Sequence, residues 1–516
     1  MHSIFSFRGQ LLVSMVWLKA GCETFRPSMF AIDNFLNSID ILPSEIPQRV
    51  KAIGGATLAC AILNTANSDA LVTISDGLIY INESHAHQSA TAWEYPDCIW
   101  TPNDTEGIIL ATKVATLARA EFSVRSGGHS PMKGFANING GLLISLSGIK
   151  DLVYDPASQT QRSGFGNRWG DVYGYLTQYG RLVVGGRVDI VGLGLTLGGG
   201  LSHSSNEYGW SAQNVISYEV VLANGSVVIA SALEHDDLFF SLKAGQNNFG
   251  IVTHITQATY PVGKVWGGVV TYPGNASAQF MSALANYQVR GQLDVKSAML
   301  PYLAFNSDII IQQFAYLHPM ERPSAFDDFY GIPTIEDHTQ IWDSYNELVS
   351  APTGYSLTRY TYAATTMYLD EETYVGATQI VQSMSSAMKN IAGGEVLILP
   401  QPISLSMINA SSARGLCPFE LENRPQLWYA ITVGWLLEKD DQQAEKILVD
   451  ILTAVEDYTK SRNQYSPFLF TNDAYTTQKP FESYGVESFA KLQATREKYD
   501  PTGVFQKLVP GGFKLT

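Results

Sequence analysis

Apolar residues in the first half of the chain come in short runs that end in glycine, asparagine or proline. Segment 104–120 is predicted to form a helix, because Asp104 can cap its first turn and apolar residues recur behind it at helical spacing. The other runs have the length of strands, and the Asn224-Gly225 dipeptide between two of them is typical of a tight hairpin. The pattern predicts strands at 122–124, 142–146, 182–184, 218–222, 227–229 and 247–253, and a second helix near 169–178.

Beyond about residue 265 the apolar segments become longer and alternate with amphipathic stretches. A helix is predicted over 440–458, where Leu448, Ile451 and Val455 share one face. Residues 428–435 are almost continuously apolar, which is typical of a strand in the middle of a sheet. The chain is therefore expected to have an α+β fold, with one α+β domain followed by a second and by a tail from about residue 460.

Composition places this chain among globular enzymes. With 516 residues it is too long for one ordinary core, and 45% of its residues are hydrophobic. The formal charge of −15 excludes the basic stripe of a nucleic-acid surface and disfavours attraction to anionic lipid. We therefore expect a small-molecule substrate, no nucleic-acid or membrane partner, and a monomer or weak dimer.

The first residues have the features of a secretory signal. Arg8 precedes an apolar run at 11–18, small residues follow at 20–21, and Lys19 interrupts the end of the run. We interpret residues 1–21 as a signal peptide and expect a secreted or secretory-pathway protein. Glycosylation sequons fit this route, and they begin at Asn82, Asn103, Asn224, Asn275 and Asn409.

The four cysteines are not spaced like metal ligands, and no metal site is expected. Cys60 and Cys98 both flank the start of the first domain, so a disulfide between them is one interpretation for a secreted protein. Two buried free thiols are the alternative. His85 and His87 lie in a polar stretch, and we interpret them as facing solvent rather than binding a metal.

Two glycine-dense segments carry the clearest chemistry. Arg125–Ser130 reads Arg-Ser-Gly-Gly-His-Ser, and Gly192–Gly200 reads Gly-Leu-Gly-Leu-Thr-Leu-Gly-Gly-Gly. Glycine lets backbone N–H groups approach a pyrophosphate closely, and Arg125 can neutralise phosphate charge. Together the two loops predict a bound flavin dinucleotide, and His129 is the residue that we expect to be bonded to it.

A Rossmann fingerprint is the main alternative for the second loop. Gly192, Gly194 and Gly198 approximate its spacing, and Glu219 would be the ribose-binding acid. A Rossmann loop opens directly into a helix, whereas residues 202–209 have the composition of a loop. The context therefore argues against a Rossmann fold.

Several ordered motifs resemble one family, the fungal berberine-bridge-enzyme-like FAD-linked oxidases of the vanillyl-alcohol-oxidase superfamily. The similarity runs from about Cys60 to the C-terminus. The motifs that carry it are the two glycine loops, the hairpin around Asn224, and residues 248–253, 499–506 and 509–515.

This resemblance implies a two-part, PCMH-type FAD-binding domain over residues 45–264. It further implies a substrate-binding domain over 265–460, with an antiparallel sheet covered by helices, and a C-terminal segment over 461–516 that returns to the FAD domain. His129 corresponds to the histidine joined to the flavin 8α-methyl group. The cofactor-binding residues would be Arg125, Ser126, Gly127, Gly128, His129, Ser130, Val191, Gly192, Gly194, Gly198, Gly199, Gly200, Gly250, Ile251 and Val252.

Three positions bear on how far the family pattern applies. Many members add a cysteine bond to flavin C6, but Val188 occupies that position, so a mono-covalent FAD is expected. Val191 stands where the family controls oxygen access to the flavin, and a valine is compatible with oxidase activity. Plant members have an acidic base on the central strand of the substrate sheet, whereas residues 427–435 contain no Asp or Glu.

The catalytic base must therefore lie elsewhere. Asp473 and Tyr475 belong to a segment that resembles the family's Asn-Tyr-x-Asp region, and Tyr429 is a third candidate. A buried aspartate would have a raised pKa suited to general-base catalysis near neutral pH. The alternatives are a solvated turn residue for Asp473 and a packed core phenol for each tyrosine.

The expected function is FAD-dependent oxidation of a small organic substrate in fungal secondary metabolism, with O2 reduced to H2O2. Alcohol oxidation, desaturation and oxidative cyclisation all fit. A carbohydrate oxidase is an alternative within the same fold, although such enzymes often have the double flavin link. A flavin scaffold that cyclises or isomerises its substrate without net redox is a second alternative, and a binding protein without its cofactor is a third.

Overall fold

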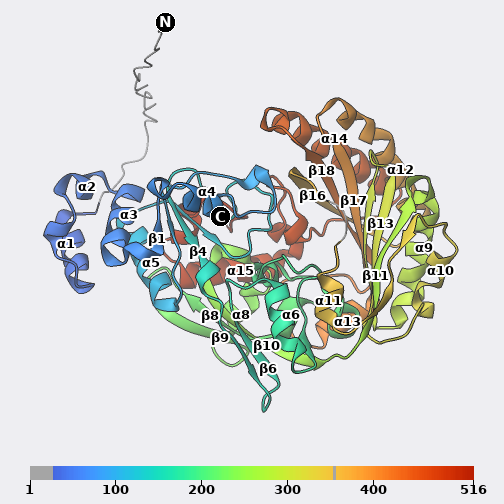
Figure 1. Ribbon diagram of the computed structural model, residues 1–516, viewed down its shortest axis with the longest axis horizontal. Coiled ribbons are helices and arrows are strands. Elements are labelled where there is room, and N and C mark those ends of the chain that lie inside the picture. The colour runs from blue at the N-terminus through green and yellow to red at the C-terminus, as the bar shows by residue number, and fades with distance from the viewer. Residues whose placement is uncertain (1–26, 353–355, 516) are drawn as a thin grey trace, which may run out of the picture.

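A computed structural model describes residues 27–352 and 356–515 and contains three sheets with helices around them (Figure 1). The signal-peptide interpretation of residues 1–21 falls outside the described residues. The combination of helices and mixed sheets confirms the α+β fold class. Among the residues that the structure describes, no helix has both the length and the apolar character needed to cross a bilayer.

The first sheet has four strands in the order β1-β2-β4-β3. Strand β4 (Leu142–Ser145) runs parallel to β2 (Cys98–Trp100) and β3 (Phe122–Arg125), whereas β1 (Leu71–Val72) is antiparallel to β2. Helix α5 (Thr105–Ala118) connects β2 to β3, and the carboxylate of Asp104 accepts a hydrogen bond from the Gly107 N–H at 2.9 Å. The predicted helix, its cap and both predicted strands are confirmed.

The second sheet has six strands, built around the long strand β10 (Ile251–Pro261). Strands β8 and β9 form the predicted hairpin, in which Gly225 has a φ of 79° and the Asn224 side chain accepts from the Ser226 N–H. Helix α6 (Trp169–Thr177) precedes strand β7. The other strands are β5 (Leu152–Asp155), β6 (Thr160–Gly164), β7 (Arg181–Val183), β8 (Val215–Val221) and β9 (Val227–Ser231).

The third sheet is antiparallel and has nine strands. Its path is β14-β11-β13-β12-β17-β18-β16-β19, and β15 pairs with β11. The strands are β11 (Val265–Pro273), β12 (Ser297–Ala304), β13 (Ile309–Tyr316), β14 (Glu336–Asp337), β15 (Gln340–Trp342), β16 (Arg359–Tyr368), β17 (Glu395–Ile403), β18 (Gln426–Trp435) and β19 (Tyr465–Ser466).

Helices cover one face of this sheet, and the other face is turned toward the part of the molecule that contains the first two sheets (Figure 1). The covering helices are α9 (Ser277–Val289), α10 (Asp327–Tyr330), α12 (Glu371–Met384) and α14 (Asp441–Ser461). Leu448, Ile451 and Val455 of α14 are buried, as the predicted amphipathic face requires. Side chains alternate along a strand, so Tyr429 of β18 packs in the helical layer, and Ala430 and Thr432 do not.

Shorter helices surround these sheets, and residues 29–66 form three helices at one end of the molecule (Figure 1). The three are α1 (Met29–Ser38), α2 (Gln48–Ile53) and α3 (Gly55–Ala66). The others are α4 (Leu78–Ser84), α7 (Ser205–Tyr208), α8 (Asp236–Leu242), α11 (Tyr345–Val349), α13 (Leu405–Ser412), α15 (Val486–Tyr499) and α16 (Val504–Lys507).

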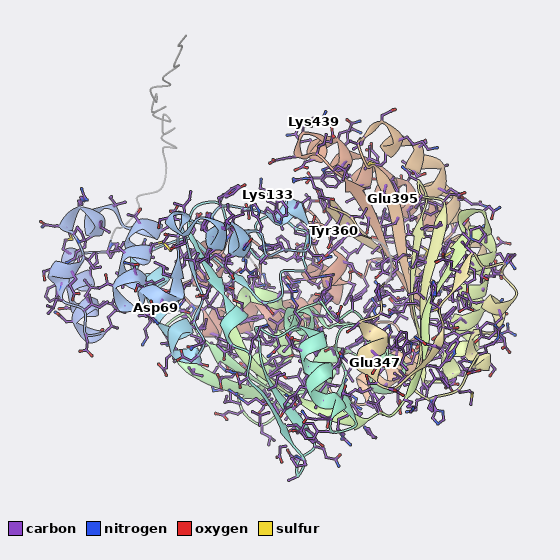
Figure 2. All side chains as sticks on the ribbon, in the orientation of Figure 1. Asp69, Lys133, Glu347, Tyr360, Glu395 and Lys439 are labelled. Carbon is purple, nitrogen blue, oxygen red and sulfur yellow. A yellow bond between two sulfur atoms is a disulfide. The ribbon has the colours of Figure 1, made fainter. Side chains whose placement is uncertain are left out.

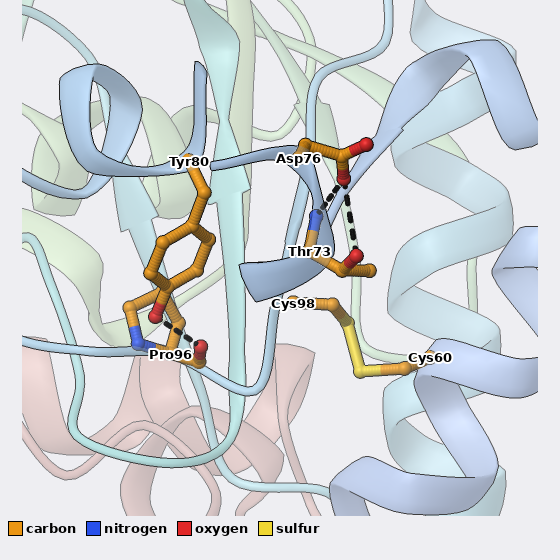
Figure 3. The surroundings of a disulfide bond; sticks show 6 residues. All are labelled: Cys60, Thr73, Asp76, Tyr80, Pro96 and Cys98. Carbon is orange, nitrogen blue, oxygen red and sulfur yellow. Dashed lines mark hydrogen bonds between the residues drawn. A yellow bond between two sulfur atoms is a disulfide. The ribbon is translucent and has the colours of Figure 1, made fainter. Parts of the chain in front are cut away.

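A disulfide joins Cys60 in α3 to Cys98 in β2 (Figure 3). It excludes the alternative of two free thiols at these positions. The bond ties the helical end of the molecule to the first sheet, close to hydrogen bonds between Thr73 and Asp76 and between Tyr80 and Pro96.

Replacing both Cys60 and Cys98 with serine is expected to destabilise the protein without removing the cofactor site. The bond closes a segment of 38 residues, and a disulfide of this span stabilises a fold by about 2–4 kcal/mol, mainly through the unfolded state. Thermal unfolding of the Cys60→Ser/Cys98→Ser variant should show a lower Tm with an unchanged flavin-to-protein absorbance ratio. A Cys417→Ser variant is the control, and an unchanged Tm in the double variant would contradict the prediction.

Residues after β19 contact the first two sheets. The Phe122 N–H donates to Leu508 O at 2.7 Å, and the Asn248 side chain donates to Phe513 O at 2.9 Å. The carboxylate of Asp237 accepts from Lys498 at 2.6 Å. The chain thus leaves the nine-stranded sheet and packs on the part of the molecule that contains the first two sheets.

Candidate active site

The two glycine loops cross each other at Gly127 and Gly192. A Cβ added to Gly127 would lie 2.5 Å from the Gly192 Cα, and one added to Gly192 would lie 2.4 Å from the Gly127 N. Real Cβ atoms do not approach backbone this closely, so both positions require glycine for the crossing itself. The crossing places the segment after β3 against the segment before the 3₁₀ turn Leu193–Gly198.

A cavity that is partly open to solvent lies along the crossing of the two loops. The C-terminal residues Phe505, Val509 and Gly512 form part of its wall. Predicted cofactor residues that line it are Ser126, Gly127, Gly128, His129, Ser130, Val191, Gly192, Gly194, Gly250, Ile251 and Val252.

Arg125 does not line this cavity. Its guanidinium is buried and donates to a carboxylate oxygen of Glu83 at 2.6 Å and to the Ser145 hydroxyl at 3.0 Å. Because Glu83 already balances its charge, Arg125 is not placed to neutralise a phosphate. It anchors the start of the first loop instead.

The three successive glycines at 198–200 also lie off the cavity wall. A Cβ on Gly198 would meet the Asn472 side chain at 2.1 Å, and one on Gly199 would meet Phe419 at 2.5 Å. A Cβ on Gly200 would meet Ser211 at 2.8 Å. These glycines therefore serve close protein packing behind the second loop rather than direct approach to a ligand.

The first loop presents unused hydrogen-bond donors. Within the described part of the chain, the backbone N–H groups of Gly127, Gly128, His129 and Ser130 donate to no other residue. Consecutive free N–H groups form a concavity that binds anions such as phosphate. The loop therefore offers an uncharged anion site, although the one arginine within it points elsewhere.

His129 lies on the cavity wall and is held by the segment beside it. The Gln88 N–H donates to Gly128 O at 2.9 Å, and Gly128 has a φ of 68°. Burial lowers the pKa of His129 to about 4, with a smaller contribution from the positive charge of Arg168. The ring is therefore neutral at pH 7, and its buried Nδ1 has no hydrogen-bond partner among the described residues.

His85 and His87 are half-buried, so the expectation that they face solvent is wrong. The His85 ring stacks on Trp93 with 4.3 Å between centroids, and His87 Nε2 lies 3.0 Å from Ala136 O. Burial lowers the pKa of His87 to about 4, and the nearby Arg125 charge adds to this. The two rings pack beside the first glycine loop.

The open face of the nine-stranded sheet meets this end of the cavity. Tyr362 of β16 lines the cavity, and its hydroxyl donates to Asn472 O at 3.0 Å. Tyr360, two residues earlier, lies on the side of the nine-stranded sheet that is turned toward the first half of the chain (Figure 2). Its hydroxyl donates to His129 O at 3.4 Å. In the register of β16 with β18, Tyr362 pairs with Thr432, so Thr432 and Ala430 lie on the same face of the sheet as Tyr362.

Asp473 is the carboxyl beside this face. Its neighbours Asn472 and Ala474 line the cavity, and its Oδ2 accepts from Gln401 Nε2 of β17 at 2.6 Å. The Gln401 Oε1 in turn accepts from the guanidinium of Arg187. Burial raises the pKa of Asp473 to about 6, against the opposing effects of Gln401 and Arg187. Asp473 itself is half-buried at the end of the 3₁₀ turn Thr471–Asp473 and does not line the cavity.

The two candidate tyrosines lie elsewhere. The Tyr429 hydroxyl is 3.4 Å from Thr378 of α12, on the helical side of the sheet, where burial raises its pKa. Tyr475 packs in the same helical layer, where burial and, after it, the negative charge of Glu445 raise its pKa. Neither tyrosine lines the cavity.

Sequence reasoning did not identify Arg187, Gln401, Tyr362 or Asn472 as parts of the site. Asn472 binds the back of the second loop through Leu195 O at 3.0 Å. The one signal within the sequence was the Thr471–Tyr475 segment itself, which includes Asn472.

The residues present fit a flavin dinucleotide. The first glycine loop lines the cavity and has free backbone N–H donors. The neutral His129, whose Nδ1 has no partner among the described residues, lies on the cavity wall. Backbone donors and a neutral ring suit a cofactor whose only charges are on its pyrophosphate.

A Gly127→Ala variant is expected to lose most of its flavin. The new Cβ would force the two loops apart, and overpacking of this kind costs about 1–3 kcal/mol. The flavin-to-protein absorbance ratio after gel filtration is the measurement. Gly263→Ala is the matched control, because a Cβ there meets nothing within 4 Å. Full flavin content in the Gly127→Ala variant would show that the crossing is not needed for binding.

Comparison with known proteins places this site in a family. Residues 96–231 match the family model described as FAD binding domain. The chain is 56% identical to bifunctional solanapyrone synthase of Alternaria solani over 484 residues, which is 94% of each protein.

Two solved structures share the fold. One is glucooligosaccharide oxidase from Acremonium strictum, described with a 6-S-cysteinyl, 8α-N1-histidyl FAD, with a TM-score of 0.68, 20% identity and coverage of 83% of this chain and 95% of that one. The other is a variant of berberine bridge enzyme, with a TM-score of 0.68, 18% identity and coverage of 86% and 97%. The resemblance noted in the sequence is thereby confirmed. The chain belongs to the family of fungal FAD-dependent oxidoreductases that includes solanapyrone synthase, and it has the fold of berberine bridge enzyme.

Proposed function

We propose that this protein is a FAD-dependent oxidase of a small organic substrate in fungal secondary metabolism, with O2 as the electron acceptor and H2O2 as the by-product. Alcohol oxidation, desaturation and oxidative cyclisation are the reactions in view. The observation that carries the proposal is the placement of Asp473. It is a half-buried carboxyl with a pKa of about 6 that does not itself line the cavity, but its two sequence neighbours do.

His129 is proposed to hold the flavin through a single covalent bond at Nδ1. Support comes from the unpartnered Nδ1 on the cavity wall and from the neutral state of the ring at pH 7. The N1-histidyl linkage named for the Acremonium strictum enzyme is of the same kind. Val188 replaces the cysteine that a second bond would need.

When bound, FAD supplies the acceptor for a hydride from the substrate and passes the electrons to O2. The chain's own part is to bind, orient and deprotonate the substrate. Asp473 takes the hydroxyl proton of an alcohol, and the hydrogen bond from Gln401 fixes which carboxylate oxygen stays free. Tyr362 lines the cavity and Tyr360 lies two residues earlier on the same face of β16, so both rings offer aromatic surface to a substrate.

Residues 45–264 and 461–516 are proposed to form the cofactor-binding unit, and residues 265–460 the substrate-binding unit. The hydrogen bonds from Phe122 and Asn248 to the last residues support this division. The protein is further proposed to act as a monomer or weak dimer in the secretory pathway or outside the cell, for which the Cys60–Cys98 disulfide gives support.

The test is anaerobic mixing of the purified flavoprotein with candidate substrates, followed by admission of air. The substrates of solanapyrone synthase come first, because that relative is 56% identical. Loss of the oxidised flavin absorbance without air, and peroxide release with air, would support the proposal. Conversion of the substrate without any flavin bleaching would favour redox-neutral cyclisation, and no reaction with any compound of this class would count against the function.

Two other functions have specific observations in their favour. The relative is described as bifunctional, which supports a second activity besides oxidation, and a redox-neutral cyclisation is the candidate for it. The fold of glucooligosaccharide oxidase supports a carbohydrate oxidase, but the absence of the second flavin-linking cysteine at Val188 makes this the weaker alternative. Peroxide release with oligosaccharides would reverse that order.

A further inference from the structure

Arg187 reaches the open face of the nine-stranded sheet from the cofactor-binding half. It follows Gly185 and Gly186, where an added Cβ would lie 2.2 Å and 2.4 Å from atoms of the Trp169 ring. Packing on this tryptophan fixes the path of the chain just before Arg187. The arginine lies deep in the protein, yet part of its surface remains accessible, as is true of Asp473 and Tyr302.

The charge of Arg187 has no direct counter-ion. Within residues 27–352 and 356–515, its guanidinium makes one hydrogen bond, to the neutral amide of Gln401, and no carboxylate lies within 4.0 Å. Two other well-buried arginines are paired, Arg125 with Glu83 and Arg359 with Asp441, each at 2.6 Å. An arginine cannot lose its proton in a protein, and an unpaired buried charge is costly. Arg187 therefore differs from these two arginines, because no carboxylate balances its charge directly and an anionic ligand could do so.

Other polar groups beside Arg187 also have unused capacity. A small cavity borders the arginine and is lined in part by Ser202, Asn206 and Gln401. His203 is fully buried, and its Nε2 has no partner among the described residues. Burial lowers the pKa of His203 to about 3, and the charge of Arg187 contributes. The surroundings of Arg187 thus offer hydrogen-bonding groups, but no negatively charged group among the described residues is in contact with its guanidinium.

Arg187 and Asp473 lie on opposite ends of one side-chain amide. Arg187 can only donate, so it fixes Gln401 Oε1 as the acceptor and turns Nε2 toward Asp473. The charges of both residues act on the Tyr302 hydroxyl from the neighbouring strand β12, and each of the three side chains keeps part of its surface accessible. A substrate that reached both accessible side chains would contact a fixed cation and a fixed carboxyl together.

We propose that Arg187 is a substrate-binding residue that donates hydrogen bonds to an anionic or strongly polarised oxygen of the substrate. Asp473 would then face the alcohol of the same molecule. This assignment rests on the proposed function, and it adds the chemical group by which the site selects its substrate. Charged hydrogen bonds from arginine are strong enough to decide such a selection.

The test is isothermal titration calorimetry of the holoenzyme with two probes. One is 4-hydroxy-6-methyl-2-pyrone, which is an enolate at neutral pH, and the other is its 4-methoxy ether, which cannot ionise. Wild-type protein is expected to bind the enolate about 10- to 100-fold more tightly than the ether. Arg187→Met should abolish this preference and leave ether binding unchanged, and Arg187→Lys should retain part of it. Arg290→Met is the control, because that arginine is paired with Asp328 on the surface.

Equal binding of both probes by the wild type, binding of neither, or an unchanged preference in Arg187→Met would overturn the proposal. Flavin absorbance and Tm show whether the methionine variant is folded, and Arg187→Lys decides if it is not. The measurement needs no turnover, so an enolate preference that depends on Arg187 would stand even if no compound bleached the flavin. Conversely, bleaching without that preference would support the oxidase and reject the role of Arg187.

Discussion

A His129→Ala variant is expected to release all of its flavin on acid precipitation, whereas the wild-type pellet remains yellow. Of the described residues that line the cavity, His129 is the only histidine. Its ring is neutral at pH 7 because burial lowers its pKa to about 4, and its Nδ1 has no competing hydrogen bond. The nitrogen is therefore available to carry a covalent bond. Absorbance spectra of the supernatant and of the resolubilised pellet are the measurement.

The control for this experiment is His338→Ala, a histidine on the surface, whose pellet should remain coloured. Loosely bound flavin in the His129→Ala variant before precipitation would show that the fold and the anion-binding loop are intact. Release of flavin from the wild-type pellet would mean that the cofactor is held without a covalent bond. Retention by the variant would assign the bond to another residue.

An Asp473→Asn variant is expected to lose about 10²- to 10⁴-fold in kcat/KM for an alcohol substrate, the usual contribution of a general base. The pH dependence gives a sharper test. Asp473 acts as a base only when ionised, so with a pKa of about 6 the wild-type kcat/KM should rise with pH up to about 6 and level off above it. The asparagine variant should lack this rise, because its amide does not titrate. Steady-state peroxide assays between about pH 5 and pH 8, the range in which this carboxyl titrates, measure the loss of kcat/KM and its pH dependence.

Asp343→Asn serves as the control, because Asp343 is an exposed partner of Lys264 far from the cavity wall. Flavin content should be the same in all three proteins. An acid limb that persists in the Asp473→Asn variant would identify another group as the base. Full activity of that variant would mean that the reaction needs no base at this position.

The cofactor loops could be predicted from the sequence because their signal is local. Ser126 to Ser130 form one short segment, and the glycines and the histidine within it have few other uses in that order. Which glycines line the cavity and which pack against other side chains was not predictable. Gly194 faces the cavity, whereas Gly199 makes room for Phe419, a residue 220 positions further along the chain. Sequence alone does not distinguish a glycine that admits a ligand from one that admits a side chain.

The open face of the nine-stranded sheet was harder to predict for a similar reason. Every residue of β18 is buried, so its sequence lacks the polar alternation that would have revealed the side on which Tyr429 lies. Arg187 and Gln401 are 214 positions apart and meet only because β17 faces the loop after β7. Asp473 was identified from a motif, but its raised pKa depends on burial among these distant residues.

The contribution of Phe505, Val509 and Gly512 to the cavity wall has a consequence for biosynthesis. A nascent chain that has not yet reached Gly512 lacks one side of the cofactor site, even when both glycine loops have already left the ribosome. Stable loading of the flavin must therefore wait until this last stretch has been translated and has docked on Phe122 and Asn248. Until then the chain must persist in an apo form, and the cofactor arrives late in its maturation.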